Sequence, residues 1–246
     1  MANAQDEATT LYGWTAVPRD LAALIQTSTS IRNPAPVYPT NTLPIANPVS
    51  QKAFQHARAS LPKPTFHHSL RVFYYGLAIV KHAFPSWLTP SFEETYFITC
   101  MFHDIGTTPE NISATKMSFE FYGGYLAKEA LTEWGGESGQ VESVAESVIR
   151  HQDVGTTGTL SRMGALIQLA TLFDNVGQNP ELISEGTTEH VVTTYPRLGW
   201  SECFAATIQQ ENELKPWCHT THLGKRDFPE GVLGNKLMEK WDKTGL

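Results

Sequence analysis

An adjacent His-Asp pair, His103 and Asp104, is the feature of this sequence with the clearest chemical meaning. It follows an apolar run over residues 95–102, while His68 lies far upstream and Asp174 far downstream. Two imidazoles and two carboxylates can hold a divalent metal and leave a position open for water. The pair alone is weak evidence, because it also occurs by chance at helix ends. The metal hypothesis therefore depends on all four residues in this order.

The helices expected around these residues would bury the carboxylates. Residues 95–102 are apolar on nearly every side, so the helix that ends at His103 should be buried throughout. Residues 166–173 lead into Asp174 in the same way. A buried carboxylate needs a cation or several donors to offset its desolvation, and the dipole at a helix C-terminus disfavours an anion. A metal meets that need, although His68 taken alone also fits a core histidine with one hydrogen bond.

The sequence around these residues resembles the fungal cyanamide hydratases, which belong to the HD superfamily of metal-dependent hydrolases. The resemblance covers about residues 45–225, most of the chain. The HD pattern by itself indicates only a metal-binding helical fold, and longer strings make the match more specific. These strings are TFHHSLRV at residues 65–72, HDIGTTP at 103–109, SFEFYGG at 118–124 and IRHQD at 149–153.

The resemblance implies an all-α HD-domain bundle with a catalytic zinc held by His68, His103, Asp104 and Asp174. It implies that a zinc-bound hydroxide hydrates the nitrile group of cyanamide to give urea, and that the chain forms a homo-oligomer. Members of the superfamily with two metals place two further histidines between the His-Asp pair and the last Asp. Only His151 lies there in this chain, so we expect one Zn²⁺ per chain.

Further residues are candidates for the chemistry beyond the metal. His151 follows an apolar helix end, and we expect it to donate a proton to the substrate or to orient it; a surface or capping histidine is the alternative. Thr107 or Thr108 could bind the amino end of the substrate, although helix capping explains either threonine. Glu120 could orient a ligand imidazole from behind, or it could be an exposed helix residue.

Two other classes of function stay open. The HD pattern is also typical of phosphohydrolases that act on nucleotides or other phosphate esters. Such a substrate needs cationic groups at the pocket, and Arg71, Arg150 and Arg162 are near enough in sequence to the ligands to be considered. Ion pairing or surface exposure explains them equally. A helical oligomer with a structural metal is the non-enzymatic alternative, but two His and two Asp suit a closed structural zinc site less than cysteines do.

Composition restricts the answer independently. The chain has 246 residues, of which 41% are hydrophobic and 17% charged, and this fits one globular core with a sparsely charged surface that favours self-association. The net charge of -7 and the lack of a Lys/Arg cluster argue against nucleic acid. Three cysteines form no Cys-x-x-Cys pair, and we expect neither a signal sequence nor a membrane span. We expect a soluble cytoplasmic protein.

The organisation expected along the chain is an extended Pro-rich arm over residues 1–46, with a short helix near 20–26, followed by a catalytic domain over 47–246. Asn47 is expected to cap a helix that begins at Pro48. Strand patterns with hairpin turns are absent, so the predicted fold class is all-α. Later helices are expected at about 65–84, 91–103 with a Ser91/Glu94 capping box, 118–134, 138–152, 159–174 and 201–215, with a short one near 235–243.

Overall fold

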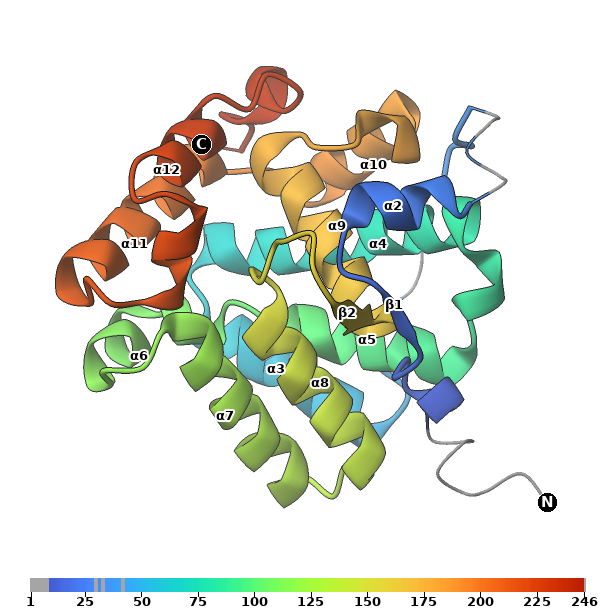
Figure 1. The fold of residues 1–246 in the computed structure, drawn as a ribbon, viewed down its shortest axis with the longest axis horizontal. Coiled ribbons are helices and arrows are strands. Elements are labelled where there is room, and N and C mark those ends of the chain that lie inside the picture. The colour runs from blue at the N-terminus through green and yellow to red at the C-terminus, as the bar shows by residue number, and fades with distance from the viewer. Residues whose placement is uncertain (1–8, 29–30, 32–33, 41–42, 246) are drawn as a thin grey trace.

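The computed structural model describes residues 9–28, 31, 34–40 and 43–245. This part of the chain is built from α-helices with short 3₁₀ turns and one two-stranded sheet (Figure 1), so the all-α prediction is confirmed. The elements in chain order are β1 (Ala16–Pro18), α2 (Leu21–Gln26), α3 (Pro48–Ser60), α4 (Lys63–Ala83), η2 (Pro85–Trp87), α5 (Pro90–Phe102), η3 (Ile105–Thr107), α6 (Pro109–Ala114), α7 (Phe119–Glu133), α8 (Ser138–Arg150), β2 (Thr159–Ser161), α9 (Arg162–Val176), η4 (Pro180–Leu182), α10 (Glu185–Thr194), α11 (Trp200–Leu214), η5 (His219–Leu223), α12 (Asp227–Leu233) and η6 (Glu239–Trp241).

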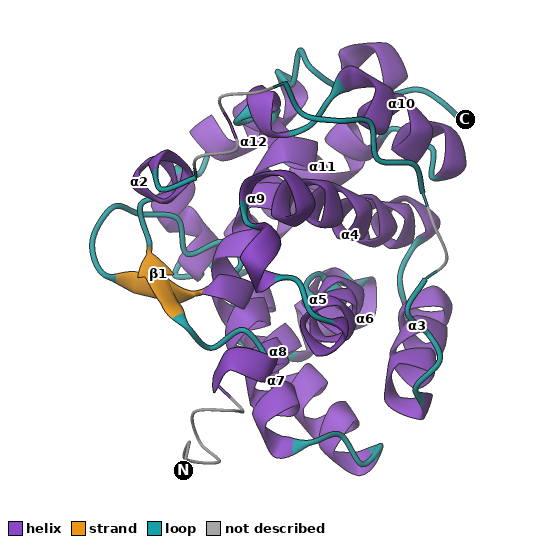
Figure 2. Cartoon of the chain, turned by 90° about the vertical axis from the view of Figure 1, so that its right-hand side faces the viewer, coloured by secondary structure: helices purple, strands orange, loops and turns teal. Residues whose placement is uncertain are grey.

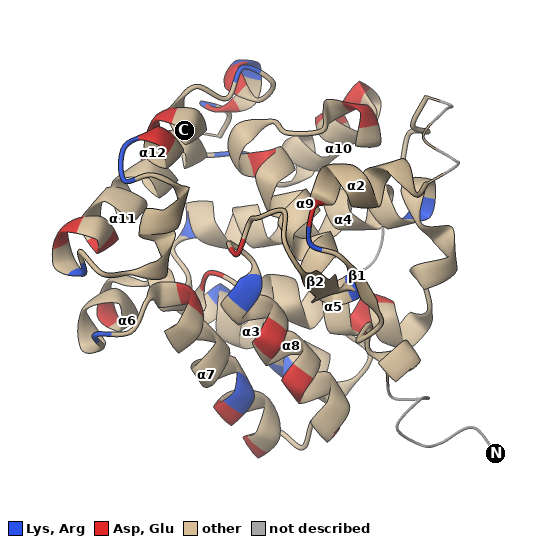
Figure 3. Ribbon diagram, in the orientation of Figure 1, with Lys and Arg blue, Asp and Glu red and all other residues tan. Residues whose placement is uncertain are grey.

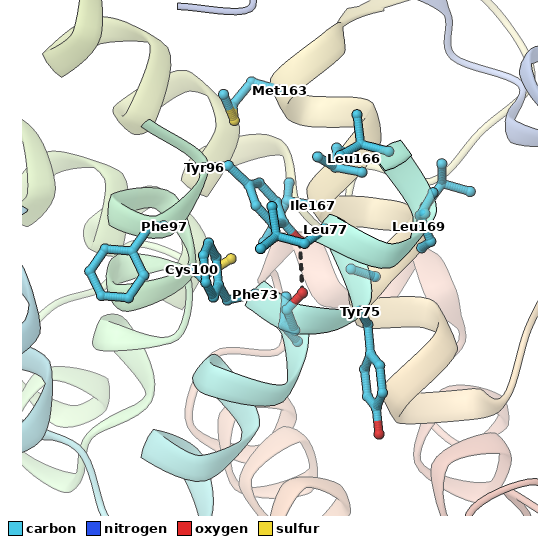
Figure 4. Packing of buried hydrophobic residues seen from close by; sticks show 14 of the residues in the cluster. Phe73, Tyr75, Leu77, Tyr96, Phe97, Cys100, Met163, Leu166, Ile167 and Leu169 are labelled. Carbon is cyan, nitrogen blue, oxygen red and sulfur yellow. Dashed lines mark hydrogen bonds between the residues drawn. The ribbon is translucent and has the colours of Figure 1, made fainter. Parts of the chain in front are cut away.

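Three helices, α4, α5 and α9, form the centre of the molecule, and the remaining helices pack around them (Figure 2). All three are apolar on most sides, as expected of helices that are buried all round. Figure 4 shows how their side chains interlock, with Phe73 and Leu77 of α4 near Tyr96 of α5 and Leu166 of α9. The metal-binding residues predicted from the sequence lie on these three helices or directly after them.

Gly76 allows α4 and α5 to approach each other closely. A Cβ at this position would lie 2.0 Å from the Tyr96 hydroxyl oxygen, so a side chain cannot be accommodated without displacing the tyrosine. That hydroxyl donates a 2.9 Å hydrogen bond to the backbone carbonyl of Val72 (Figure 4). The contact fixes the spacing between the helices that carry His68 and His103.

Several predicted helix ends are confirmed. Asn47 caps α3 with its side chain accepting from the Val49 N–H at 2.9 Å, and Pro48 is the first helical residue. Gly177 ends α9 in the left-handed conformation with φ 70°, which glycine adopts without steric cost. This stop leaves Asp174 in the last turn of a helix that is buried along most of its length.

Other predicted boundaries were wrong. Helix α5 begins at Pro90, and Thr89 caps it by accepting from Phe92 N–H at 3.1 Å, so the predicted Ser91/Glu94 capping box does not form. Residues 159–161 form strand β2 rather than the start of a helix, and residues 235–243 contain only a 3₁₀ turn. Helices α6, α10 and α12 were not predicted. They are short, and their local patterns are weak.

The described part of residues 1–46 packs on the helical body. Strand β1 pairs antiparallel with β2, with Val17 opposite Leu160. Arg19 extends this contact, because its Nε donates to the backbone carbonyl of Asp153 at 3.0 Å. The division into an arm and a catalytic domain stays a prediction. Within the described ranges, no helix combines the length and the apolar character needed to cross a bilayer.

Candidate metal centre and active site

Three of the predicted ligands converge in the interior. Helix α4 carries His68, and the end of α5 supplies His103 and Asp104, which follow each other at the turn into η3. One ligand atom from each residue lies within 4.8 Å of those of the other two. The Nε2 atoms of His68 and His103 lie 3.6 and 3.2 Å from Oδ2 of Asp104. The sequence prediction that these residues meet is therefore supported by their geometry.

The polar atoms that face this point have no hydrogen-bond partner among the described residues. They are Nε2 of His68, Nε2 of His103 and both carboxylate oxygens of Asp104, together with Nε2 of His151. Each belongs to a side chain that is at most 2% exposed. Buried polar atoms without partners cost about 1–3 kcal/mol each, and natural proteins keep few of them. A divalent cation would satisfy the nitrogens and oxygens together, so the residues fit a metal.

Hydrogen bonds at Nδ1 fix the orientation of the three imidazole rings. His103 and His151 each donate from Nδ1 to the backbone carbonyl three residues earlier, at 2.8 and 2.6 Å. His68 donates from Nδ1 to Oδ2 of Asp174 at 2.6 Å. In each ring the proton is thus held on Nδ1 and the lone pair is left on Nε2, which is the arrangement that metal-binding histidines use.

Asp174 adjoins the three converging residues but is engaged elsewhere. Its carboxylate accepts from Nδ1 of His68, from Nε and Nη2 of Arg71 at 3.1 and 2.9 Å, and from Nη1 of Arg197 at 2.6 Å. All of these side chains are buried. Burial alone would raise the pKa of Asp174, but the two guanidinium groups hold it well below its ordinary value. Asp174 is thus an ionised carboxylate behind His68.

His151 lies on the other side of Asp104, at the C-terminal end of α8. Its Nε2 is 3.7 Å from Oδ1 of Asp104, and its ring centre is 5.3 Å from that of His103. Burial lowers the pKa of His151, and it lowers the pKa of His68 to about 4. Both rings are therefore neutral at neutral pH, and His151 presents a proton acceptor to the metal position.

A narrow cavity of about 10 Å³ adjoins these residues, enough for roughly one water molecule. Most of its wall was not predicted from the sequence, and part of it comes from α11, η5 and α12 in the C-terminal part of the chain. The lining residues are His103, Asp104, His151, Gln152, Val154, Thr171, Leu172, Asn175, Phe204, Leu223 and Phe228. A larger hollow of about 520 Å³ opens to solvent elsewhere, and its lining includes Glu110, Glu129 and Glu133 but no predicted ligand.

The other predicted residues lie close by in different roles. The Thr107 hydroxyl donates to the backbone carbonyl of Asp104 at 2.7 Å, and Thr108 caps α6 by accepting from a backbone N–H. Neither threonine lines the cavity. Glu120 is fully buried rather than exposed, and its Oε1 accepts from Nδ1 of His219 at 2.8 Å. Local sequence patterns do not predict this contact, because the two residues are 99 positions apart.

The arginines considered for phosphate binding are engaged with other groups. Arg71 pairs with Asp174, Arg150 donates to Asp153 at 3.0 Å, and Arg162 lies over the Trp87 ring at 5.3 Å. None of the three lines the cavity. Figure 3 shows Lys and Arg spread over several elements. Among the described residues, no Lys or Arg lines the cavity at the metal position.

Comparison with known proteins agrees with this architecture. Residues 65–183 match the HD domain. The chain is 40% identical over 225 residues to cyanamide hydratase DDI2 of Saccharomyces cerevisiae, and to cyanamide hydratase DDI3 of the same yeast by the same measure. Each match covers 91% of this chain and 96% of the relative.

Proposed function

Because the chain belongs to the cyanamide hydratase family of HD-domain proteins, we propose that it hydrates the nitrile group of cyanamide to urea at the metal centre described above. The observation that carries this proposal is the buried set of Nε2 and carboxylate atoms without partners at the edge of a cavity of about 10 Å³. Such a site combines an open metal position with space for only a very small substrate.

We propose that one Zn²⁺ binds per chain through Nε2 of His68, Nε2 of His103 and the carboxylate of Asp104. Among the described residues this is the one group of three or more that could hold a metal. Three protein ligands would leave a position for water, as in catalytic zinc sites. The role of Asp174 follows from its contacts: it holds His68 by its Nδ1–H and balances the charge of two buried arginines, so we assign it to positioning rather than to direct ligation.

A bound divalent metal lowers the pKa of a coordinated water to roughly 7 and so supplies a nucleophile at neutral pH. His151 faces the same position with a neutral ring and a free lone pair on Nε2. It is therefore suited to accept a proton from the attacking water and to deliver it to the nitrile nitrogen. Phe204, Leu223 and Phe228 give the cavity an apolar wall beside this position. Neither Thr107 nor Glu120 has to contact the substrate in this scheme.

The small cavity also selects among substrates. A pocket for a drug-sized or nucleotide-sized molecule occupies roughly 300–1,000 Å³, whereas this one holds about 10 Å³ and has no arginine in its wall. Cyanamide has three heavy atoms, so it needs far less additional space than a nucleotide does. A phosphohydrolase would require a larger opening and a cationic wall. This cavity has neither feature among its lining residues.

The proposal is tested by metal analysis of the purified protein combined with assays of urea release from cyanamide and phosphate release from nucleotides. We expect about one zinc per chain and urea formation that disappears after chelation and returns with Zn²⁺. Rapid phosphate release without any urea would contradict the assignment.

We further propose that the protein is a cytoplasmic homo-oligomer that binds no nucleic acid. Its three cysteines are free, which suits a reducing compartment. Exposed large apolar side chains, including Tyr125 and Trp217, each 60% exposed, are candidates for contact between copies. Light scattering coupled to size-exclusion chromatography gives the oligomeric state directly, and a purely monomeric profile would contradict this part.

A further inference from the structure

Glu120 and His219 form a pair that joins the buried interior to the protein surface. Glu120 stands in the first turn of α7 and is fully buried, while His219 begins η5 with 25% of its side chain exposed. Nδ1 of His219 donates to Oε1 of Glu120 at 2.8 Å. Oε2 of Glu120 is buried and has no hydrogen-bond partner among the described residues. A buried carboxylate oxygen without a hydrogen-bond partner lowers the stability of the folded protein, so its retention requires a functional explanation.

The inner end of this pair adjoins the active site. Burial and the neighbouring His103 lower the pKa of His151, and the charges of Asp104 and Glu120 oppose that shift, so Glu120 lies within electrostatic reach of His151. The residue before Glu120, Phe119, packs its ring against His151 with centroids 5.6 Å apart. Glu120 therefore directly follows a residue that packs against His151, and its unpartnered Oε2 is buried.

The outer end leads to solvent. Nε2 of His219 lies 3.8 Å from Oδ1 of Asp153, which also binds Arg19, and the exposed His222 ring lies 4.3 Å from the His219 ring. The hydrogen bond with Glu120 raises the pKa of His219, and burial and Arg19 act against that shift. His219 can thus exchange a proton with water through its partly exposed side chain.

Nitrile hydration requires two proton transfers. Both O–H bonds of the water break and two N–H bonds form at the former nitrile nitrogen, with no oxidant or reductant involved. His151 has one free nitrogen and carries one proton at a time. The cavity has room for roughly one water, so a route through protein side chains can serve the other transfer.

We propose that Glu120 and His219 form a proton relay between the active-site cavity and solvent. One proton leaves the water oxygen for solvent through Glu120 and His219, and one proton returns from solvent to the nitrogen by the same route. The relay therefore carries no net proton in each turnover. This inference rests on the proposed hydration of cyanamide at the metal centre.

The same contacts would also serve a purely structural clamp. The backbone N–H of His219 donates to Oγ of Ser118 at 2.8 Å, and η5 carries Leu223, which lines the cavity. A clamp needs the hydrogen bond between residues 120 and 219 but not a titrating ring. His219→Gln separates the two roles, because its amide can still donate to Glu120 yet cannot take up a proton near neutral pH.

The experiment compares His219→Gln, His219→Ala and Glu120→Gln with wild type in urea release, with metal content measured in each. The relay predicts that both His219→Gln and Glu120→Gln lower kcat roughly tenfold with KM and metal content unchanged, and that added imidazole restores kcat in His219→Ala. His222→Gln is the matched control and should keep wild-type kcat. Wild-type kcat in His219→Gln, or loss in His219→Ala that imidazole does not restore, would overturn the relay.

A second readout does not depend on activity. In ¹⁵N NMR spectra of the metal-free protein, Nδ1 of His219 should stay protonated across the pH range while Nε2 titrates, and Glu120→Gln should shift that titration to lower pH. If Glu120→Gln leaves the titration of the His219 ring unchanged, the relay is also overturned. Failure of the proposed function is recognised separately, since wild-type protein would then release no urea while the His219 titration remained measurable.

Discussion

Replacement of Asp174 by asparagine tests the assignment of this residue to positioning. Four N–H donors point at its carboxylate: Nδ1 of His68, Nε and Nη2 of Arg71, and Nη1 of Arg197. An asparagine side chain has one acceptor oxygen, and its amide group would face the guanidinium donors. Asp174→Asn therefore removes the charge that compensates two fully buried arginines.

The expected loss is large. Removing one partner of a buried ion pair costs about 3–5 kcal/mol. In a chain of this size, 1 kcal/mol corresponds to about 2–4 °C in melting temperature, so we expect Tm of Asp174→Asn to fall by about 6–20 °C. The measurement is differential scanning calorimetry of the metal-free protein, so that any loss of metal does not contribute.

Asp242→Asn is the matched control. The Asp242 carboxylate also accepts from Arg197, at 2.9 Å from Nε, but its side chain is 15% exposed and water can replace part of the interaction. Its Tm should fall by a smaller amount. An Asp174→Asn protein that melts within about 2 °C of wild type would refute the energetic reasoning. Wild-type stability in the metal-free state combined with complete loss of zinc binding would show that Asp174 is instead a direct ligand.

Three further predictions concern the metal position and its surroundings. His103→Ala and Asp104→Ala should each lose zinc and urea formation together, as measured by elemental analysis and assay; full metal occupancy in an active Asp104→Ala protein would contradict the ligand assignment. His151→Asn should keep zinc and lower kcat about a hundredfold; wild-type turnover would make the residue a bystander, and a metal-free variant would place it among the ligands. Because the pKa of His219 is raised on folding, chiefly by Glu120, this histidine stabilises the protein fully below about pH 6.5 and loses that contribution as pH rises through the folded pKa. The stability difference between wild type and His219→Gln in denaturant titrations should therefore be larger at pH 6 than at pH 9, and an equal difference would contradict the shift.

Helix positions were read from the sequence where the local pattern was strong. The apolar run before His103 and the one before Asp174 predict buried helices, and the structure places both residues at such helix ends. Asn47 and Gly177 mark boundaries through local hydrogen bonds and backbone conformation, which depend on few neighbours. Strand β2 could not be predicted in this way, because residues 159–161 pair with residues 16–18, far away in the chain.

What the sequence determined by itself is the set of chemical groups: the order His68, His103-Asp104, Asp174, with His151 between, already predicts a helical metal-binding protein. Tertiary structure alone decided which of their atoms face one another. Asp174 is bound by Arg71 and Arg197, which reach it from other elements, and Glu120 pairs with His219 across 99 positions of sequence. Periodicity and helix-capping signals describe local backbone and burial, whereas the partner of a buried charge depends on side chains that folding brings together from distant segments.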